Sequence, residues 1–292
     1  MSKTNADKFI LGTVQMGVNY GVNNTTGKIS LKESHAILEY AFDNGITILD
    51  SAEAYGNAHE VIGSFHKKQP NKLFEVITKL PHQFDANIND KVNTYLKDLQ
   101  VSQLHALLFH SFSSYKAHID NFKVLVDLKS KGKIKFIGVS VYTNDEIEDV
   151  LLNDDVDIIQ LPFNLFDNSN LRGDILAKAK AKGKMIHTRS ALLQGLFFKD
   201  INSDHKTVQS LKTELTQLAT ISRLKNVPMA QLALNYCLQQ DTIDNVLIGV
   251  DSRQQLEANI EALDHTIEQE TINEINGLNV SNINLLNPSL WT

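Results

Sequence analysis

Cysteine is almost absent from this sequence, since Cys237 is the only one among 292 residues. A disulfide within the chain is therefore excluded, which fits a protein of a reducing compartment. Cys237 lies in the apolar stretch 230–238, so we expect a buried structural thiol rather than a nucleophile. Disulfide scaffolds and thiol catalysis are accordingly set aside.

An excess of positive charge and a long apolar run are also missing. Lysine and arginine total 28 against 34 aspartates and glutamates, a formal net charge of −6, which argues against a nucleic-acid-binding surface. The first residues, MSKTNADKF, lack the apolar core of a signal peptide, and no apolar run reaches the length of a membrane span. We therefore expect a cytoplasmic protein whose partner is a small molecule. No pattern in the sequence indicates its oligomeric state.

What the sequence does contain is an alternation of short apolar runs and helical segments. β-Branched apolar runs are typical of buried parallel strands, and apolar residues spaced three and four apart are typical of helices. The predicted strands cover residues 9–11, 46–50, 73–78, 104–109, 134–139, 156–161, 185–188 and 246–249. The predicted helices cover residues 31–44, 58–66, 88–99, 119–130, 145–152, 171–182, 253–263 and 267–278, with two more within 207–238; residues 14–27 are expected to form a long loop.

Eight strand–helix units in this length predict a closed (β/α)8 TIM barrel of the α/β class. No Pro- or Ser-rich linker divides the chain, so we expect one domain over residues 1–292, with a C-terminal helix and short tail from about residue 267. An open doubly wound sheet that binds a dinucleotide would show Gly-x-Gly-x-x-Gly after its first strand. The segment 12–17, GTVQMG, has the wrong spacing.

Polar residues end several of the predicted strands, where the sites of barrel enzymes lie. Asp50, Lys79 and His110 end three consecutive strands, and Tyr55 follows the first of them within the stretch ITILDSAEAYG. Each has an ordinary explanation alone: a solvated lysine at a strand end, a structural histidine, a tyrosine that packs. Because consecutive parallel strands end at one rim, the four are expected to converge on one site.

The four side chains together suit proton transfer to a carbonyl. Lys79 pairs with Asp50, so neither charge is buried alone. We expect the ammonium to favour tyrosinate and lower the pKa of Tyr55, which makes Tyr55 the natural general acid. His110 can hold and orient the substrate oxygen. None of these groups donates hydride, so a redox cofactor is required.

Four features of the sequence resemble the aldo-keto reductases: LGTVQMG at 11–17, LDSAEAYG at 49–56, the strand-end Lys79, and the apolar run to His110. The resemblance extends from residue 9 to about residue 263. It implies a nicotinamide-dependent carbonyl reductase on a (β/α)8 barrel, with the cofactor at the strand tips. It also implies that Tyr55 is the acid, that Lys79 and Asp50 tune it, and that His110 orients the carbonyl.

The resemblance also implies a set of cofactor contacts. Ser140 and Gln160 fall where the family hydrogen-bonds the nicotinamide carboxamide, although Val141 stands where the family often has asparagine. Arg189 stands where well-known members stack a tyrosine on the nicotinamide, and an arginine plane can also stack. Ser190, Leu192, Gln194 and Gly195 would line the pyrophosphate. The remaining implied positions are Gly12, Thr13, Asp50, Gly249, Val250, Asp251, Gln255 and Asn259.

The choice between NADP(H) and NAD(H) depends on the last strand–helix turn. Many relatives place lysine or arginine there to pair with the 2′-phosphate, but here Arg253 is the only nearby cation. Asp251 can be the N-cap of the following helix, or it can bond a ribose 2′-hydroxyl and disfavour a phosphate. By the resemblance we expect NADP(H), with NAD(H) left open.

The leading hypothesis is therefore an NAD(P)H-dependent oxidoreductase that reduces an aldehyde, ketone or sugar-like substrate. The alternative is a cofactor-binding sensor or accessory subunit on the same barrel, because fold alone does not imply turnover. A metal enzyme is not expected, because the ten histidines include no His-Glu-x-x-His motif.

Overall fold

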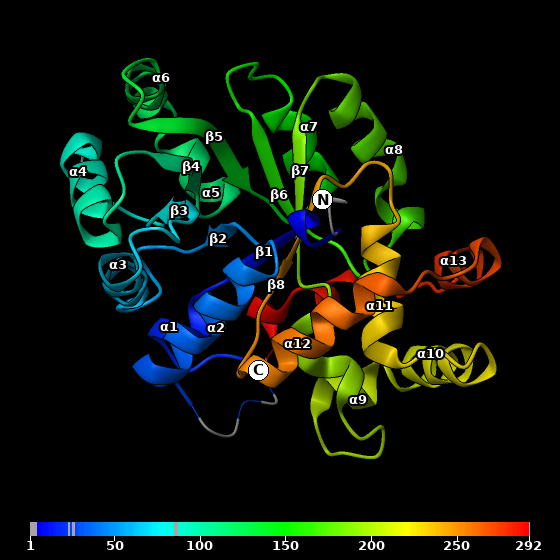
Figure 1. The fold of residues 1–292 in the computed structure, drawn as a ribbon. Helices are drawn as coiled ribbons and strands as arrows, with labels where there is room; N and C mark the ends of the chain where they lie inside the picture. The colour runs from blue at the N-terminus through cyan, green and yellow to red at the C-terminus, as the bar shows by residue number, and fades with distance from the viewer. Residues whose placement is uncertain (1–4, 23, 25–26, 85–86, 292) are drawn as a thin grey trace.

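Eight parallel strands close into a barrel in chain order in the computed structural model, which describes residues 5–22, 24, 27–84 and 87–291 (Figure 1). The strands are β1 (Phe9–Gly12), β2 (Ile48–Asp50), β3 (Glu75–Leu80), β4 (Leu104–Phe109), β5 (Ile134–Ser140), β6 (Ile158–Pro162), β7 (Met185–Arg189) and β8 (Asn245–Ile248). Every neighbouring pair is parallel, and β8 pairs with β1 to close the barrel. The predicted (β/α)8 barrel is confirmed.

The helices surround the barrel (Figure 1). They are α1 (Val14–Gly17), α2 (Leu31–Asp43), α3 (Ala58–Lys68), α4 (Ile88–Leu99), α5 (Phe112–Ala117), α6 (Phe122–Ser130), α7 (Asn144–Val150), α8 (Ser169–Ala181), α9 (Lys206–Ser210), α10 (Lys212–Leu224), α11 (Met229–Leu238), α12 (Arg253–Glu261) and α13 (Gln269–Asn276). Local signals explain several starts: Ser30 caps α2, and Thr143 with Glu146 forms a capping box on α7. No helix in the described part of the chain is long and apolar enough to cross a membrane.

Two segments differ from the prediction. The expected loop 14–27 begins with the single turn of α1, whose Met16 is buried; its residues 23, 25 and 26 lie outside the described part of the chain. Residues 207–238, expected to hold two helices, belong to three, because the buried Leu211 has non-helical dihedral angles and separates α9 from α10. Both differences are local interruptions that apolar spacing alone does not reveal.

Alternation along each strand divides the core into two parts. The barrel interior is filled by Ile10, Ile77, Ala106, Leu108 and Ile158. The intervening strand residues belong to the larger cluster between the strands and the helices, and the fully buried Cys237 belongs to it as well. The prediction of a buried structural thiol is therefore confirmed.

Two glycines bring α1 against the turn that carries Tyr55. A Cβ on Gly17 would lie 1.7 Å from the carbonyl oxygen of Tyr55, and a Cβ on Gly56 would lie 2.5 Å from the carbonyl oxygen of Gly17. Gly56 also has a φ of +56°, which disfavours any residue with a side chain. The backbone after β1 and the backbone after β2 are therefore in direct contact.

Candidate active site

The period of two along a strand determines which polar side chains enter the barrel. Ile77 and Leu108 face the interior, so Lys79 and His110, each two residues further on, continue the same face. The same count from Ile158 reaches Gln160. The carboxyl ends of the strands thus direct one polar residue each toward the barrel axis, as the sequence predicted.

A buried network connects three strands at this rim. Lys79 Nζ donates to Asp50 Oδ1 at 2.5 Å and to the carbonyl oxygen of Ser51 at 3.0 Å. Gln160 Nε2 donates to the other carboxylate oxygen, Asp50 Oδ2, at 2.9 Å. Lys79 and Asp50 are each about 2% exposed, so the pair is shielded from water. In that buried environment, removing one partner leaves an unpaired charge, which is costly. Burial lowers the pKa of Lys79, and the Asp50 carboxylate opposes that shift.

Tyr55 lies directly above this pair. Lys79 Nζ is 5.3 Å from the centroid of the Tyr55 ring, and the His110 ring meets the same ring edge to face at 5.8 Å. The expected lowering of the tyrosine pKa is wrong: burial first, and then the charge of Asp50, raise the pKa of Tyr55. Because Asp50 largely neutralises Lys79, no net ammonium charge reaches the phenol. Tyr55 therefore holds its proton at neutral pH.

His110 is held as a neutral imidazole. Burial lowers its pKa to about 3, and the nearby cationic Lys79 and the neighbouring His82 act in the same direction. His82, which the sequence analysis did not single out, stacks on His110 with ring centroids 4.7 Å apart. The Nδ1 atom of His110 is buried without a hydrogen-bond partner in the structure. A neutral imidazole at this rim can donate or accept one hydrogen bond to a substrate oxygen.

Acid is expected to destabilise the fold through histidines of this kind. Burial also lowers the pKa of His187, inside the barrel, to about 3. Between about pH 6.5 and pH 3 the unfolded chain binds protons that His110 and His187 do not bind when folded, so their contribution to stability is complete above pH 6.5 and is lost as pH falls. The urea midpoint should therefore be lower at pH 5 than at pH 7.5. His187→Leu should flatten this dependence, whereas the exposed His265→Asn should not; equal pH dependence in both variants would contradict the assignment.

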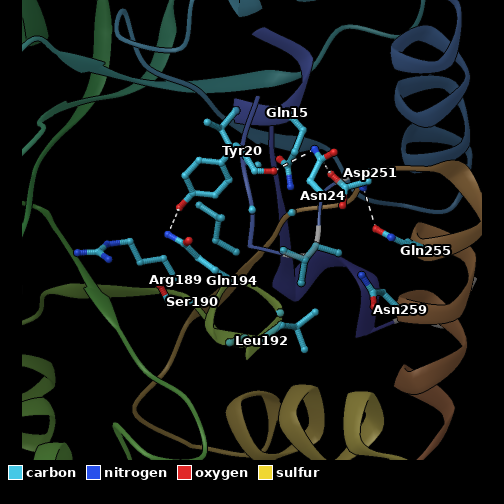
Figure 2. Close-up of a pocket in the computed structure, with 18 of the residues that line it drawn as sticks. Gln15, Tyr20, Asn24, Arg189, Ser190, Leu192, Gln194, Asp251, Gln255 and Asn259 are labelled. Atoms are coloured by element: carbon cyan, nitrogen blue, oxygen red, sulfur yellow. Dashed lines mark hydrogen bonds between the residues drawn. The ribbon is translucent and has the colours of Figure 1, made fainter. Parts of the chain in front are cut away.

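A cavity of about 470 Å³ extends from Tyr55 to α12. Figure 2 shows Arg189 and Ser190 on one side of it, with Asp251, Gln255 and Asn259 on the other. The predicted cofactor positions that line it are Gly12, Thr13, Asp50, Gln160, Arg189, Ser190, Leu192, Gln194, Gly195, Gly249, Asp251, Gln255 and Asn259. Ser140 and Val250 are buried and do not line the cavity. Lys79 and His110 do not line it either.

Three further lining residues come from the segment after β1. Tyr20 accepts a hydrogen bond at its hydroxyl from Gln194 Nε2 at 2.9 Å, and Asn24 Nδ2 donates to Asp251 Oδ1 at 3.2 Å (Figure 2). Gln15 contributes a buried Oε1 atom with no hydrogen-bond partner in the structure. The sequence analysis missed all three because an aperiodic loop gives no facing pattern. The one signal in the sequence was that this segment follows the carboxyl end of β1, where the sites of barrel enzymes lie.

The backbone after β7 is strained where it borders the cavity. Leu193, Gln194 and Gly195 have φ values of 45°, 52° and 89°, and Ser190 has a φ of 62°. Left-handed conformations in residues other than glycine cost about 1–3 kcal/mol each and concentrate at ligand clamps. Successive residues of this kind also form concave backbone sites that suit anions.

Arg189 and Asp251 both line the cavity, and each makes contacts that the sequence did not indicate. Arg189 places its guanidinium 4.1 Å from the centroid of the Tyr142 ring and donates to the carbonyl oxygen of Val141 at 3.3 Å. The N-cap of α12 is Ser252, whose hydroxyl accepts from the N–H of Gln255, so the N-cap role considered for Asp251 is wrong. Asp251 does not cap the helix and lines the cavity.

No group of three or more His, Cys, Asp or Glu side chains within the described ranges is arranged to hold a metal ion.

A family model, curated proteins and a solved structure were each found to be similar to this chain. A family model described as the Aldo/keto reductase family matches residues 8–280. The chain is 26% identical over 273 residues to L-galactose dehydrogenase of Arabidopsis thaliana, covering 86% of each chain. It is 23% identical to NADH-specific methylglyoxal reductase of Escherichia coli, covering 75% of this chain and 79% of that protein. The fold matches an aldo-keto reductase from Bacillus halodurans in its holo form, with a TM-score of 0.77, 19% identity, and coverage of 94% and 93%.

Proposed function

Because this chain belongs to the aldo/keto reductase family of oxidoreductases, we propose that it reduces an aldehyde or ketone, in the cytoplasm, by hydride transfer from a nicotinamide cofactor. The observation that carries the proposal is the position of Tyr55, between the buried Lys79–Asp50 pair and the open cavity. A protonated phenol at that position can deliver a proton to an oxygen in the cavity. Tyr55 is accordingly the proposed general acid.

The surrounding residues support this role. Each oxygen of the Asp50 carboxylate accepts a hydrogen bond, one from Lys79 and the other from Gln160, so the group beside Tyr55 has a defined position. His110, neutral and adjacent to the Tyr55 ring, is the proposed second contact for the carbonyl oxygen. His110 does not itself line the cavity, so the proposed site of the carbonyl oxygen is beside Tyr55, where a second donor would stabilise the negative charge that develops.

Features of the cavity fit a dinucleotide. The strained backbone around residues 193–195 offers a concave site suited to the pyrophosphate. Gly249 packs directly against Gln15 in the cavity lining, because a Cβ on Gly249 would lie 2.8 Å from Gln15 Nε2. Arg189, Ser190, Leu192, Gln194 and Gly195 are proposed to hold the nicotinamide and pyrophosphate. When bound, the cofactor supplies hydride; the protein supplies the proton and the orientation.

The substrate is proposed to be small and sugar-like or aldehydic. The names of the relatives describe a dehydrogenase of L-galactose and a reductase of methylglyoxal, both with small polar carbonyl or hydroxyl groups.

The proposal is tested by mixing the full chain with NADH or NADPH and a panel of aldehydes, ketones and aldoses, and following the loss of absorbance of the reduced cofactor. We expect turnover with at least one small polar carbonyl. Because hydride and proton transfer are both required, turnover should fall sharply in Tyr55→Phe while cofactor binding persists.

The negative result is also informative. Cofactor binding by the wild type without turnover across the panel would favour the sensor or accessory subunit. Absence of both binding and turnover in a folded sample would contradict the proposed function as a whole.

A further inference from the structure

The α12 side of the cavity is rich in hydrogen-bond acceptors. It is lined by Asn24, from the segment after β1, and by Asp251, Gln255 and Asn259, from the β8–α12 region (Figure 2). The Asp251 carboxylate is held in place, because Oδ1 accepts from Asn24 Nδ2 at 3.2 Å and the backbone N–H of Asp251 donates to Gln255 Oε1 at 2.8 Å. A negative charge therefore has a defined position at this end.

The positively charged side chains of this region do not face the α12 side of the cavity. Among the described residues that line the cavity, Arg189 is the one with a positive charge, and it lies at the end of β7 on the opposite side. Arg253, the nearest cation in sequence, donates from Nε to Glu257 Oε1 at 2.9 Å and places its guanidinium 4.6 Å from the centroid of the Tyr40 ring. Residues 23, 25 and 26, which lie outside the described part of the chain, are asparagine and two threonines and carry no charge.

Lys28, the lysine that follows this segment in the sequence, is also held elsewhere. Lys28 Nζ donates to Asn57 Oδ1 at 2.7 Å. The backbone N–H of Arg253 donates to Glu33 Oε1 at 2.9 Å, which adds a second carboxylate around the start of α12. A phosphate group at this end would thus meet the Asp251 carboxylate, with no cation on this side among the described residues that line the cavity.

NAD(H) and NADP(H) differ at one position, the 2′ oxygen of the adenosine ribose. A ribose 2′-hydroxyl is neutral and can donate a hydrogen bond to a carboxylate, whereas a 2′-phosphate is an anion with acceptor oxygens alone. Selectivity is a difference of affinities, and an unpaired like charge acts against the wrong ligand. A carboxylate beside this ribose would therefore attract one ligand and repel the other.

We propose that this protein selects NAD(H) over NADP(H), and that Asp251 is the specificity-determining residue, receiving a ribose hydroxyl at the α12 end of the cavity. The inference rests on the proposed function, because it assumes that the cavity holds the dinucleotide. It departs from the NADP(H) preference expected from resemblance. The physical reason is that the turn 249–253 carries an acid facing the cavity and an arginine paired on the outside.

The test is a calorimetric titration of the full chain with NADH and NADPH at pH 8, which needs no substrate. The wild type should bind NADH at least 10-fold more tightly than NADPH. Asp251→Ser should reduce that ratio by about 10-fold, mainly by strengthening NADPH binding. Asp264→Ser, an exposed acid outside the cavity, is the matched control and should leave the ratio unchanged.

Arg253→Ala distinguishes the competing arrangement, in which Arg253 turns inward to hold a 2′-phosphate. That substitution should leave NADPH binding unchanged, and a specific loss of NADPH affinity would overturn the inference. Tighter binding of NADPH than NADH by the wild type, or no shift in the ratio on Asp251→Ser, would overturn it as well. Failure of the folded wild type, checked by circular dichroism, to bind either cofactor would instead contradict the proposed function.

Discussion

Tyr55→Phe is expected to lower kcat for carbonyl reduction by about 10²–10⁴-fold, the range over which a positioned general acid contributes. The substitution removes the phenolic proton donor and keeps the ring, which packs edge to face against His110. The Lys79–Asp50 pair below should be undisturbed, because neither partner bonds the phenol oxygen. Steady-state kinetics with the best substrate of the panel, together with the dissociation constant of the cofactor, measure the effect.

A matched control separates loss of the acid from loss of a tyrosine hydroxyl in general. Tyr115 is buried on α5, and its hydroxyl accepts from Asn153 Nδ2 at 3.2 Å, away from the cavity. Tyr115→Phe should leave kcat within about twofold of the wild type. If Tyr55→Phe retained a tenth or more of the wild-type kcat, another group would have to be the acid.

Separating the buried pair is expected to cost about 3–5 kcal/mol of the free energy of unfolding. Lys79→Met leaves the Asp50 carboxylate buried with Gln160 as its side-chain partner, and Asp50→Asn leaves a buried ammonium. The double variant, Asp50→Asn with Lys79→Met, carries no unpaired charge. Its cost should therefore be clearly smaller than the sum of the two single costs, and urea unfolding at pH 7.5 measures all three.

The exposed pair of Lys131 and Asp127, with an Nζ–Oδ2 distance of 2.6 Å, is the control for this cycle. Its partners are half exposed, and exposed pairs contribute about 0–1 kcal/mol. Lys131→Met should accordingly have little effect on the urea midpoint. Additive costs for Asp50→Asn and Lys79→Met would show that the two charges do not depend on each other.

The rim of the site was predictable because strands follow a strict rule. Residues two apart face the same way, so the interior positions of Lys79, His110 and Gln160 follow from the apolar residues before them. The segment after β1 obeys no such rule, and Tyr20 and Asn24 were consequently missed although they line the cavity. Periodicity carries information about regular elements, and loops lack it.

Electrostatic predictions failed for a different reason. The sequence placed a lysine near Tyr55 but could not weigh the ammonium against burial and against Asp50. The structure shows that those two effects raise the pKa of Tyr55. Likewise, Asp251 and Ser252 are both good N-cap residues, and the chain geometry selects Ser252. Residue types indicate which groups can interact, and the distances determine which of them do.

The contact between Gly17 and Gly56 bears on how this barrel can be rebuilt. With no room for a Cβ on either side, the segment after β1 and the turn that holds Tyr55 fit each other closely. The first segment borders the cavity at Gln15 and the second carries the phenol. Loop exchange between barrels of this kind therefore has a minimum unit: the two segments must be transplanted together, because either alone would lose its fit.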